Sequence, residues 1–451
     1  MKQLVFTKGY NFPIQHRASA VIQKAPDSTF IGLSFRDFAH ISFKVLVKEN
    51  DNISLSQALA YPKKYANINF CSPASGIISA INYGPKRVLE SIVIKTNNLF
   101  HQSNNCLSVA EINNFASQKV QDFLLTQGYW HLFKTFPKKE FAPLDLSLIK
   151  AVHINAYQNE PFYPATKLIL QDKQEYLKAG ITALSKMINN INIYTIKDDN
   201  SYYQDCLDKC SLVNIKQQYP AELLGVQAFY SDKLTESQCA IGIDLPSVID
   251  IGQHLLTGVR ATERIYSLSG NGIKTPHHVI AKIGSSVADI TANNLKESSK
   301  LRFIIGGILQ GKKVNQEDFL MLKDNAIQVF IEDEKRVPLS FLRLGLDKIT
   351  LSKTWLSYWL TKEQEMSTNN NGEERACISC GYCIDVCPVK LLPNLLMKAS
   401  IISDATKLQE LSANDCVDCG LCTFVCPSKI EVLEHINKGR EMMIKEGYYA
   451  V

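Results

Sequence analysis

The first hundred residues show short runs in which apolar positions alternate with polar ones, separated by turn residues. These runs cover residues 20–22, 43–47, 76–81 and 89–94. A period of two predicts β-strands, and the glycines, prolines and asparagines between the runs predict turns. We therefore expect residues 1–100 to form a small all-β module.

The pattern changes to mixed helix and strand periods over residues 105–245. Residues 109–127 carry apolar side chains at helical spacing and predict an amphipathic helix, whereas residues 151–156 are typical of a buried strand. The G-x-G-x-x-G fingerprint of dinucleotide-binding folds follows none of the predicted strands. These residues therefore predict an α/β domain without that fingerprint.

Short strands return over residues 246–350, where 264–269 and 302–305 end at glycines and predict an α+β domain. The stretch from Gly306 to Lys313 differs from a P-loop at Lys313, which stands where Ser or Thr should hold Mg²⁺. We interpret it as a structural glycine-rich turn. Residues 361–376 are polar and without periodicity, which predicts a linker. A tail follows over residues 377–451, and its clearest predicted helix covers 429–446.

Composition narrows the class of protein. The chain has 451 residues, 45% of them hydrophobic and 21% charged, which is long enough for about three domains. No run reaches the roughly 18 apolar residues of a membrane span, and no secretory signal is expected at the basic, then polar start. The net charge of +5 is spread along the chain, so it favours mild attraction to anionic surfaces or partners and gives no case for nucleic acid.

Eight of the thirteen cysteines fall in the tail, in two copies of the pattern C-x2-C-x2-C-x3-C-P. This is the ligand spacing of two [4Fe-4S] clusters, in which the fourth cysteine of each copy ligates the other cluster. Structural zinc usually uses two separated C-x2-C pairs, so zinc is the less favoured alternative. The spacing assigns Cys377, Cys380, Cys383 and Cys426 to cluster 1, and Cys416, Cys419, Cys422 and Cys387 to cluster 2. Apolar neighbours such as Ile378 and Val417 predict a dry environment for both clusters.

Other candidate groups have simpler interpretations. Cys206 and Cys210 lie four apart on a predicted helix and are expected to be free structural thiols in a reducing compartment. His277 and His278 follow a proline and predict a surface turn. No acid, base or nucleophile accompanies the cysteines, so the chain is expected to have no catalytic residue for bond-making chemistry.

Several short motifs spread over nearly the whole chain carry a family resemblance. They are Lys8-Gly9-Tyr10-Asn11-Phe12-Pro13-Ile14, Ser72-Pro73-Ala74-Ser75-Gly76, Gly128-Tyr129-Trp130, Asn155-Ala156, Tyr219-Pro220-Ala221, Ile251-Gly252, Thr257-Gly258 and Ser340-Phe341-Leu342-Arg343-Leu344-Gly345. The chain resembles NqrA, a subunit of the Na⁺-translocating NADH:quinone reductase. Its paired cysteine motifs, with Pro393 and the closing Cys426-Pro427-Ser428, resemble RnfC of the Rnf complex, a relative in which a two-cluster ferredoxin domain follows a similar core.

The resemblance implies a multidomain α+β protein. Residues 1–100 would form a barrel-sandwich hybrid module, 105–245 a Rossmann-like α/β core, and 246–350 a β-grasp domain of the soluble-ligand-binding type with an α+β segment. The linker 361–376 would then lead to an α-helical ferredoxin-type domain at 377–451. The turn from Cys71 to Gly76 fits a biotinyl- or lipoyl-type module, without the Met-Lys turn that such carriers expose.

One departure from the RnfC pattern bears on cofactors. Where RnfC has a glycine-rich loop associated with flavin and NADH, this chain has Lys134-Thr135-Phe136-Pro137-Lys138-Lys139. A phosphate that lies against backbone amides needs residues without side chains, so this loop argues against FMN and NADH. NqrA lacks the cysteine motifs, and this chain therefore resembles an NqrA-type core with an electron-carrying tail.

The resemblance implies a peripheral electron-transfer subunit on the cytoplasmic face of the bacterial inner membrane. It would relay electrons through two [4Fe-4S] clusters in an ion-translocating NADH:quinone or Rnf-type NADH:ferredoxin oxidoreductase. Integral-membrane and flavoprotein subunits would be its partners, and the sequence leaves quinone binding open. Two alternatives are a free-standing flavin and iron-sulfur oxidoreductase, and a structural docking subunit whose clusters are idle.

Overall fold

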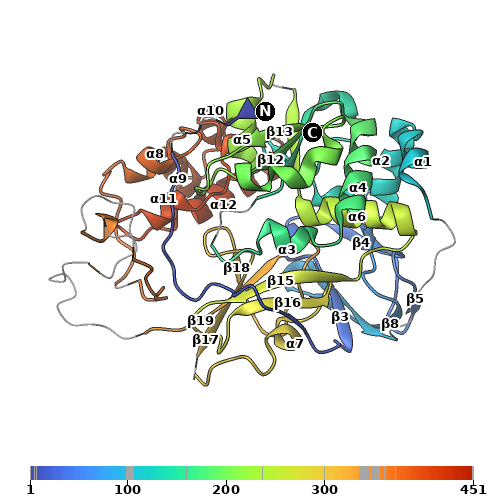
Figure 1. The fold of residues 1–451 in the computed structure, drawn as a ribbon. Helices are drawn as coiled ribbons and strands as arrows, with labels where there is room; N and C mark the ends of the chain where they lie inside the picture. Colours follow the sequence, from blue (N-terminus) through green and yellow to red (C-terminus); the bar gives the residue numbers. More distant parts are fainter. Residues whose placement is uncertain are drawn as a thin grey trace.

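The computed structural model describes residues 2–4, 6, 8–97, 106–157, 161–235, 237–298, 300–334, 346, 356–359, 362–370 and 372–448. The motif at 340–345 lies outside the described residues. In Figure 1 the helices of the tail, coloured orange and red, lie at one end of the molecule, and α1 (Val109–Asn113), α2 (Ser117–Thr126) and α4 (Gln174–Met187) lie at the other. No helix among the described residues is long and apolar enough to cross a membrane.

The N-terminal module consists of two antiparallel sheets. One contains β3 (Phe30–Ser34), β9 (Leu89–Thr96), β8 (Gly76–Tyr83) and β5 (Asn52–Ile53), and the other β4 (Phe43–Val45), β6 (Ala58–Pro62) and β7 (Phe70–Cys71). The rings of Phe35, Phe43 and Phe70 pack within 5.3 Å of one another between centroids and fill the space between the sheets. The strands predicted at 43–47, 76–81 and 89–94 are present.

Two strands within the first 24 residues pair with sheets outside that module. Strand β1 (Lys2–Gln3) pairs in parallel with β13 (Ser211–Asn214) of the α/β domain, and β2 (Ile22–Lys24) pairs in parallel with β16 (His277–Lys282) of the third domain. The run at 20–22 therefore does contain a strand position, but the strand completes a different sheet. A short apolar run reports that a strand forms and carries no information on its partner.

The α/β domain has a six-stranded sheet in the order β1-β13-β12-β11-β14-β10, in which only β10 is antiparallel to its neighbour. The strands after β1 are β10 (Lys134–Phe136), β11 (Ile149–Asn155), β12 (Ile191–Thr195), β13 (Ser211–Asn214) and β14 (Cys239–Asp244). The helices are α1 (Val109–Asn113), α2 (Ser117–Thr126), α3 (Thr166–Leu170), α4 (Gln174–Met187), α5 (Leu224–Ser231) and α6 (Leu245–Thr257). The buried strand predicted at 151–156 is β11.

Two local features of this domain follow from its residues. The helix predicted at 109–127 is broken: a Ser108–Glu111 capping box starts α1, which ends at Asn113, and α2 begins only after Ala116. Helices α4 and α6 pack very closely, since a Cβ at Gly252 would lie 1.8 Å from the carbonyl oxygen of Tyr176. The Ile251-Gly252 motif therefore has a packing role.

The third domain is a six-stranded mixed sheet with the order β18-β17-β19-β15-β16-β2. Its elements are β15 (Glu263–Ser269), β16 (His277–Lys282), α7 (Val287–Thr291), β17 (Leu301–Ile305), β18 (Lys312–Val314) and β19 (Ala326–Ile331). The surface turn predicted at His277 and His278 is wrong, because both residues lie in β16 and are buried. Arg264 on β15 donates two hydrogen bonds to Asp250 on α6, at 2.9 and 2.7 Å, and joins this domain to the α/β domain.

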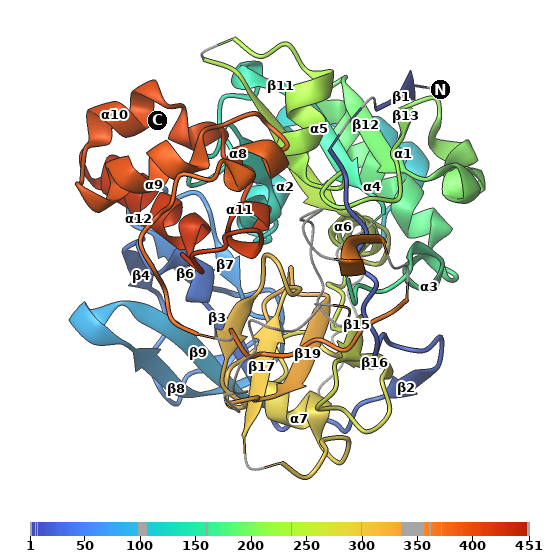
Figure 2. The same cartoon turned by 90° about the vertical axis from the view of Figure 1, so that its left-hand side faces the viewer.

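The stretch predicted as a linker is hydrogen-bonded where it is described. Gln364 donates its backbone N–H to the carbonyl of Pro13 at 2.8 Å, and Thr368 accepts from the backbone N–H of Asp333 at 2.8 Å. The stretch thus runs along the N-terminal segment and the third domain. The tail then folds into α8 (Tyr382–Val386), α9 (Pro393–Ile401), α10 (Ala405–Glu410), α11 (Leu421–Phe424) and α12 (Val432–Lys445). Figure 2 shows this group of helices beside α5.

Candidate iron-sulfur centre

The two cysteine loops of the tail have the same backbone conformation. Ser379 and Asp418, which precede the second cysteine of each loop, have φ of 54° and 57°, and Gly381 and Gly420, which follow it, have φ of 82° and 72°. A short helix, α8 or α11, then begins at once and carries the third cysteine. Left-handed backbone at two such closely spaced positions turns the chain around a central volume. The repeated spacing in the sequence therefore corresponds to a repeated local structure.

The four cysteines assigned to cluster 1 line one cavity of about 390 Å³, including its open mouth. Cys377, Cys380 and Cys383 come from the first loop, and Cys426 closes the cavity from the second. The other lining residues are Ile378, Ser379, Gly381, Asn394, Met397, Pro427, Ser428, Ile430 and Val432, none of which is charged. A volume enclosed by four thiols and apolar walls fits a [4Fe-4S] cluster.

The cysteines assigned to cluster 2 form a second, more buried set. Burial raises the pKa of Cys416 to about 11 and also raises the pKa of Cys419 and Cys422, and the nearby Cys387 thiol adds to each shift. Cys387 comes from the first loop, so this group combines three cysteines of the second loop with one of the first. Iron binds thiolates, and its binding at this site must therefore displace protons that burial holds on the sulfur atoms.

Among the described residues, no three His, Cys, Asp or Glu side chains converge closely enough to hold a single metal ion. A cubane is larger than one ion and binds each thiolate at a different iron. Thiols spread around a cavity match that requirement. Such a cluster would supply one-electron transfer, and the cysteines of the two loops would hold it.

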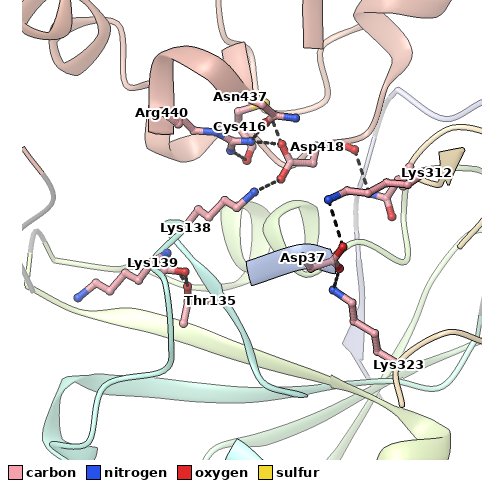
Figure 3. A network of polar contacts seen from close by, with 11 residues as sticks. Asp37, Thr135, Lys138, Lys139, Lys312, Lys323, Cys416, Asp418, Asn437 and Arg440 are labelled. Carbon is pink, nitrogen blue, oxygen red and sulfur yellow. Dashed lines mark hydrogen bonds and ion pairs between the residues drawn. The ribbon is translucent and has the colours of Figure 1, made fainter. Parts of the chain in front are cut away.

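The loop around cluster 2 is seated on the rest of the protein by charged groups (Figure 3). Asp418 forms an ion pair of 2.7 Å with Lys138, which follows β10, and a second one with Arg440 on α12. Burial opposes ionisation of Asp418, but Arg440 and Lys138 outweigh it and hold the pKa of this carboxyl well below its usual range. Gln310 donates to the backbone carbonyl of Asp418 at 3.0 Å.

Hydrogen bonds from distant parts of the chain meet the same region. Tyr219 donates its hydroxyl to the carbonyl of Cys419, and Tyr230 donates to that of Pro388 at 2.9 Å. Lys8, near the start of the chain, donates to the carbonyl of Cys387 at 3.3 Å. The sequence shows Lys8 and Tyr219 only as parts of family motifs and gives no sign of their contact with the tail.

Two loops of the core, one rich in glycine and one without it, lie against the tail. The turn containing Gly306 and Gly311 lies against the second cysteine loop, because a Cβ at Gly420 would be 2.4 Å from the carbonyl oxygen of Leu309 in that turn. Lys138 belongs to the glycine-free stretch 134–139, which stands where RnfC has its glycine-rich loop. Its backbone N–H also donates to the carbonyl of Asn414 at 3.1 Å. Both loops thus contact the tail.

A second cavity, of about 280 Å³, lies at the carboxyl ends of β11 and β14. It is lined by Asn155, Ala156, Tyr163, Pro164, Thr166, Ile169, Leu245, Pro246 and Asn325. This is the position at which α/β sheets commonly bind ligands, because the strand order reverses there. The lining offers neutral polar groups and no cation for a phosphate.

Four family models match the chain. They are the NqrA N-terminal barrel-sandwich hybrid domain at residues 4–97, the NqrA second alpha/beta domain at 115–260, the NQRA C-terminal domain at 265–316, and the 4Fe-4S dicluster domain at 376–430. The chain joins an NqrA-type core to a dicluster domain. The predicted resemblance and the predicted multidomain α+β class, with its barrel-sandwich, α/β and ferredoxin-type parts, are therefore confirmed.

Curated relatives agree with the matches to the NqrA core. The chain is 28% identical to a protein of Marinomonas sp. (strain MWYL1), over 90% of this chain and 91% of the relative. It is also 28% identical to one of Mannheimia succiniciproducens, over 91% and 92%, and 27% identical to one of Haemophilus influenzae, over 90% and 91%. All three are named as the A-subunit of a Na(+)-translocating NADH-quinone reductase, so the relatives that this chain resembles are subunits of an oxidoreductase complex.

Likeness to solved structures is weaker. A chain of an NAD⁺-reducing [NiFe]-hydrogenase in the H2-reduced state matches with a TM-score of 0.38 and 9% identity, over 77% of this chain and 66% of that one. A similarity at this level does not bear on function.

Proposed function

We propose that this NqrA-type chain is an electron-relay subunit of an ion-translocating membrane NADH:quinone oxidoreductase. In this proposal Cys377, Cys380, Cys383 and Cys426 hold an outer [4Fe-4S] cluster, and Cys416, Cys419, Cys422 and Cys387 hold an inner one. The observation that carries the proposal is the pair of equivalent cysteine loops, one of which is seated on the core through Asp418. The subunit would sit on the cytoplasmic face of the membrane, bound through integral-membrane and flavoprotein subunits.

A relay of this kind suits the chemistry of the overall reaction. NADH delivers two electrons as a hydride, whereas each cluster carries one electron at a time. Two clusters in one domain allow a pair of electrons to pass in sequence at a fixed separation. None of the residues lining the outer cavity is charged, so no side chain there would neutralise the added electron.

Membership of an Rnf-type complex is the second candidate, and the paired cysteine motifs favour it. The two candidates differ in whether flavin is expected to bind. In this chain the loop at Lys138 lacks the glycines expected at a nucleotide site and instead contacts Asp418. For an Nqr-type subunit we expect no bound FMN or NADH. Quinone binding to this subunit is left open by the loop. The alternatives of a free-standing flavoenzyme and of idle clusters predict different results in the experiments below.

The test is to purify the protein without oxygen, count iron, sulfide and flavin, and record EPR spectra before and after NADH and then dithionite. About eight irons per chain, no flavin, and reduction by dithionite alone are expected. Bound flavin with clusters reduced by NADH alone would favour an Rnf-type or free-standing enzyme, and the absence of any iron-sulfur signal would refute the proposal.

Single-cysteine variants test the assignment and the relay. Cys380→Ser should remove about half of the iron and leave the inner cluster, and Cys419→Ser should do the reverse. Cys106→Ser is the matched control, because Cys106 is an exposed cysteine outside both motifs. If the cysteine variants at either cluster leave NADH:quinone turnover of the assembled complex intact, the clusters are idle.

A further inference from the structure

The two cysteine loops share a backbone but differ in their surroundings. Position by position, Ile378 corresponds to Val417, Ser379 to Asp418 and Gly381 to Gly420. The φ angles at the last two pairs agree within 10°. The two loops therefore have the same backbone shape. The surface of the core that covers the inner loop shows what kind of surface could cover the outer loop.

The core of the protein shows how the inner loop is covered. The carbonyl of Leu309 approaches so closely that a Cβ at Gly420 would be 2.4 Å from its oxygen. The side chain of Val417 lies against Gly225 on α5, where a Cβ would meet it at 2.3 Å. Inner-loop coverage thus combines a backbone carbonyl over the glycine with an apolar slot for the valine. Lys138 adds an ion pair to Asp418.

The same face of the outer loop is open. A Cβ at Gly381 would meet nothing within 4 Å, and the side chain of Ile378 is 68% exposed. The expectation of a dry environment at Ile378 is therefore wrong for this chain alone. Cys380, one of the proposed ligands, is also exposed. The outer cavity thus has an apolar rim and a thiol that reaches the surface.

We propose that the outer loop, residues 378–381, is the docking surface for a redox partner protein, which covers it as the core covers the inner loop. This inference rests on the proposed relay function. The partner presents the backbone carbonyl of a turn over Gly381 and an apolar slot that receives Ile378. A redox protein is the occupant because electrons must enter or leave the outer cluster, and a bare rim at Cys380 gives a partner cofactor the shortest approach.

The comparison with the inner loop also predicts the charge of the partner's surface. The inner loop has Asp418 facing a lysine, whereas the outer loop has the neutral Ser379 at that position. The partner therefore needs no cation there, and its association should depend only weakly on salt. Burial of an isoleucine at the centre of such an interface makes Ile378 the side chain with the largest expected contribution.

The test uses membranes from cells in which this chain has been deleted, to which the cluster-loaded chain is added back. NADH-driven reduction of a short-chain quinone is measured against the concentration of added chain. Ile378→Glu should raise the half-saturating concentration by about ten-fold or more, because it buries a charge in an apolar slot. Its iron content and dithionite-reduced EPR spectrum are recorded first, so that the concentrations compared are those of cluster-loaded protein.

Two variants serve as controls. Ile378→Leu should restore the wild-type concentration dependence, and Ile402→Glu places the same charge on an isoleucine of the same domain that is 71% exposed but outside the loop. If Ile378→Glu loses iron, Ser379→Lys puts a charge on the same face without changing Ile378. That variant should show the same loss of affinity.

Each outcome decides the question. If wild type restores turnover and neither Ile378→Glu nor Ser379→Lys changes its half-saturating concentration, the docking surface is refuted and the relay function stands. If wild type restores nothing, the proposed function fails and this inference fails with it. A wild-type dimer in light scattering that Ile378→Glu dissociates would assign the surface to a second copy of the chain, against the proposal.

Discussion

Alanine at Gly420 is expected to loosen the tail from the core, whereas alanine at Gly381 is not. Both glycines have left-handed backbone, so each substitution carries a similar local cost of about 1–2 kcal/mol. Only at Gly420 does the new Cβ meet the carbonyl oxygen of Leu309 at 2.4 Å, well under the 3.0 Å below which such contacts essentially never occur. Overpacking of this kind costs roughly 1–3 kcal/mol. The difference between the two variants therefore measures the contact between the inner loop and the core.

Amide hydrogen exchange can read this difference. The backbone N–H of Lys138 donates across the boundary to the carbonyl of Asn414 at 3.1 Å, so its exchange reports how often the tail separates from the core. In cluster-loaded protein, Gly420→Ala should speed exchange at Lys138 by about 5- to 150-fold relative to wild type. Gly381→Ala should leave it nearly unchanged. Equal acceleration in both variants would refute the reasoning, because the loop backbone, and not the contact with Leu309, would then control separation of the tail from the core.

Two further predictions concern charged groups. Lys138→Met should accelerate exchange at this position, corrected for the intrinsic rate of the new residue, by only about five-fold or less, because the Lys138 side chain is 48% exposed and exposed ion pairs contribute about 1 kcal/mol or less; a larger acceleration would contradict this. Burial opposes ionisation of Asp37, but Lys323 and Lys312 outweigh it and hold its pKa well below the usual range. The charged Asp37 therefore stabilises the fold above about pH 4 and loses this contribution as the pH falls further. Urea unfolding followed by tryptophan fluorescence should show Asp37→Asn less stable than wild type at pH 7, with a gap that narrows below pH 4; a constant gap would exclude the pairing as its cause.

The local structure of the centre could be predicted because the chemistry restricts it. Two equally spaced sets of cysteines, each with a glycine after the second, require the same turn, and Gly381 and Gly420 adopt the same left-handed backbone. Strands such as β8 and β9 follow from their alternation. The break at Asn113 was missed, although Ser108 and Glu111 form a capping box that marks a helix start and is readable in the sequence.

The seating of the tail could not be predicted. Gln310 and Asp418 are 108 residues apart, and Lys8 and Cys387 are 379 apart. Contacts over such distances leave no periodic signal in a single sequence, and a lysine in a loop looks like any solvated charge. The difference in exposure between Ile378 and Val417 is likewise invisible, because it depends on what lies opposite each loop.

The N-terminal segment has a consequence for how the protein is made. It pairs through β1 with β13, donates from Lys8 to Cys387, packs Phe12 against Phe424 and pairs through β2 with β16. Every one of these partners is synthesised later than the segment itself. The segment therefore cannot complete its contacts until the tail has been made, which couples its seating to the folding of the domain that carries the cysteine loops. A change that weakens the segment, at Lys8 or Phe12, would then disturb a region almost four hundred residues away in the sequence.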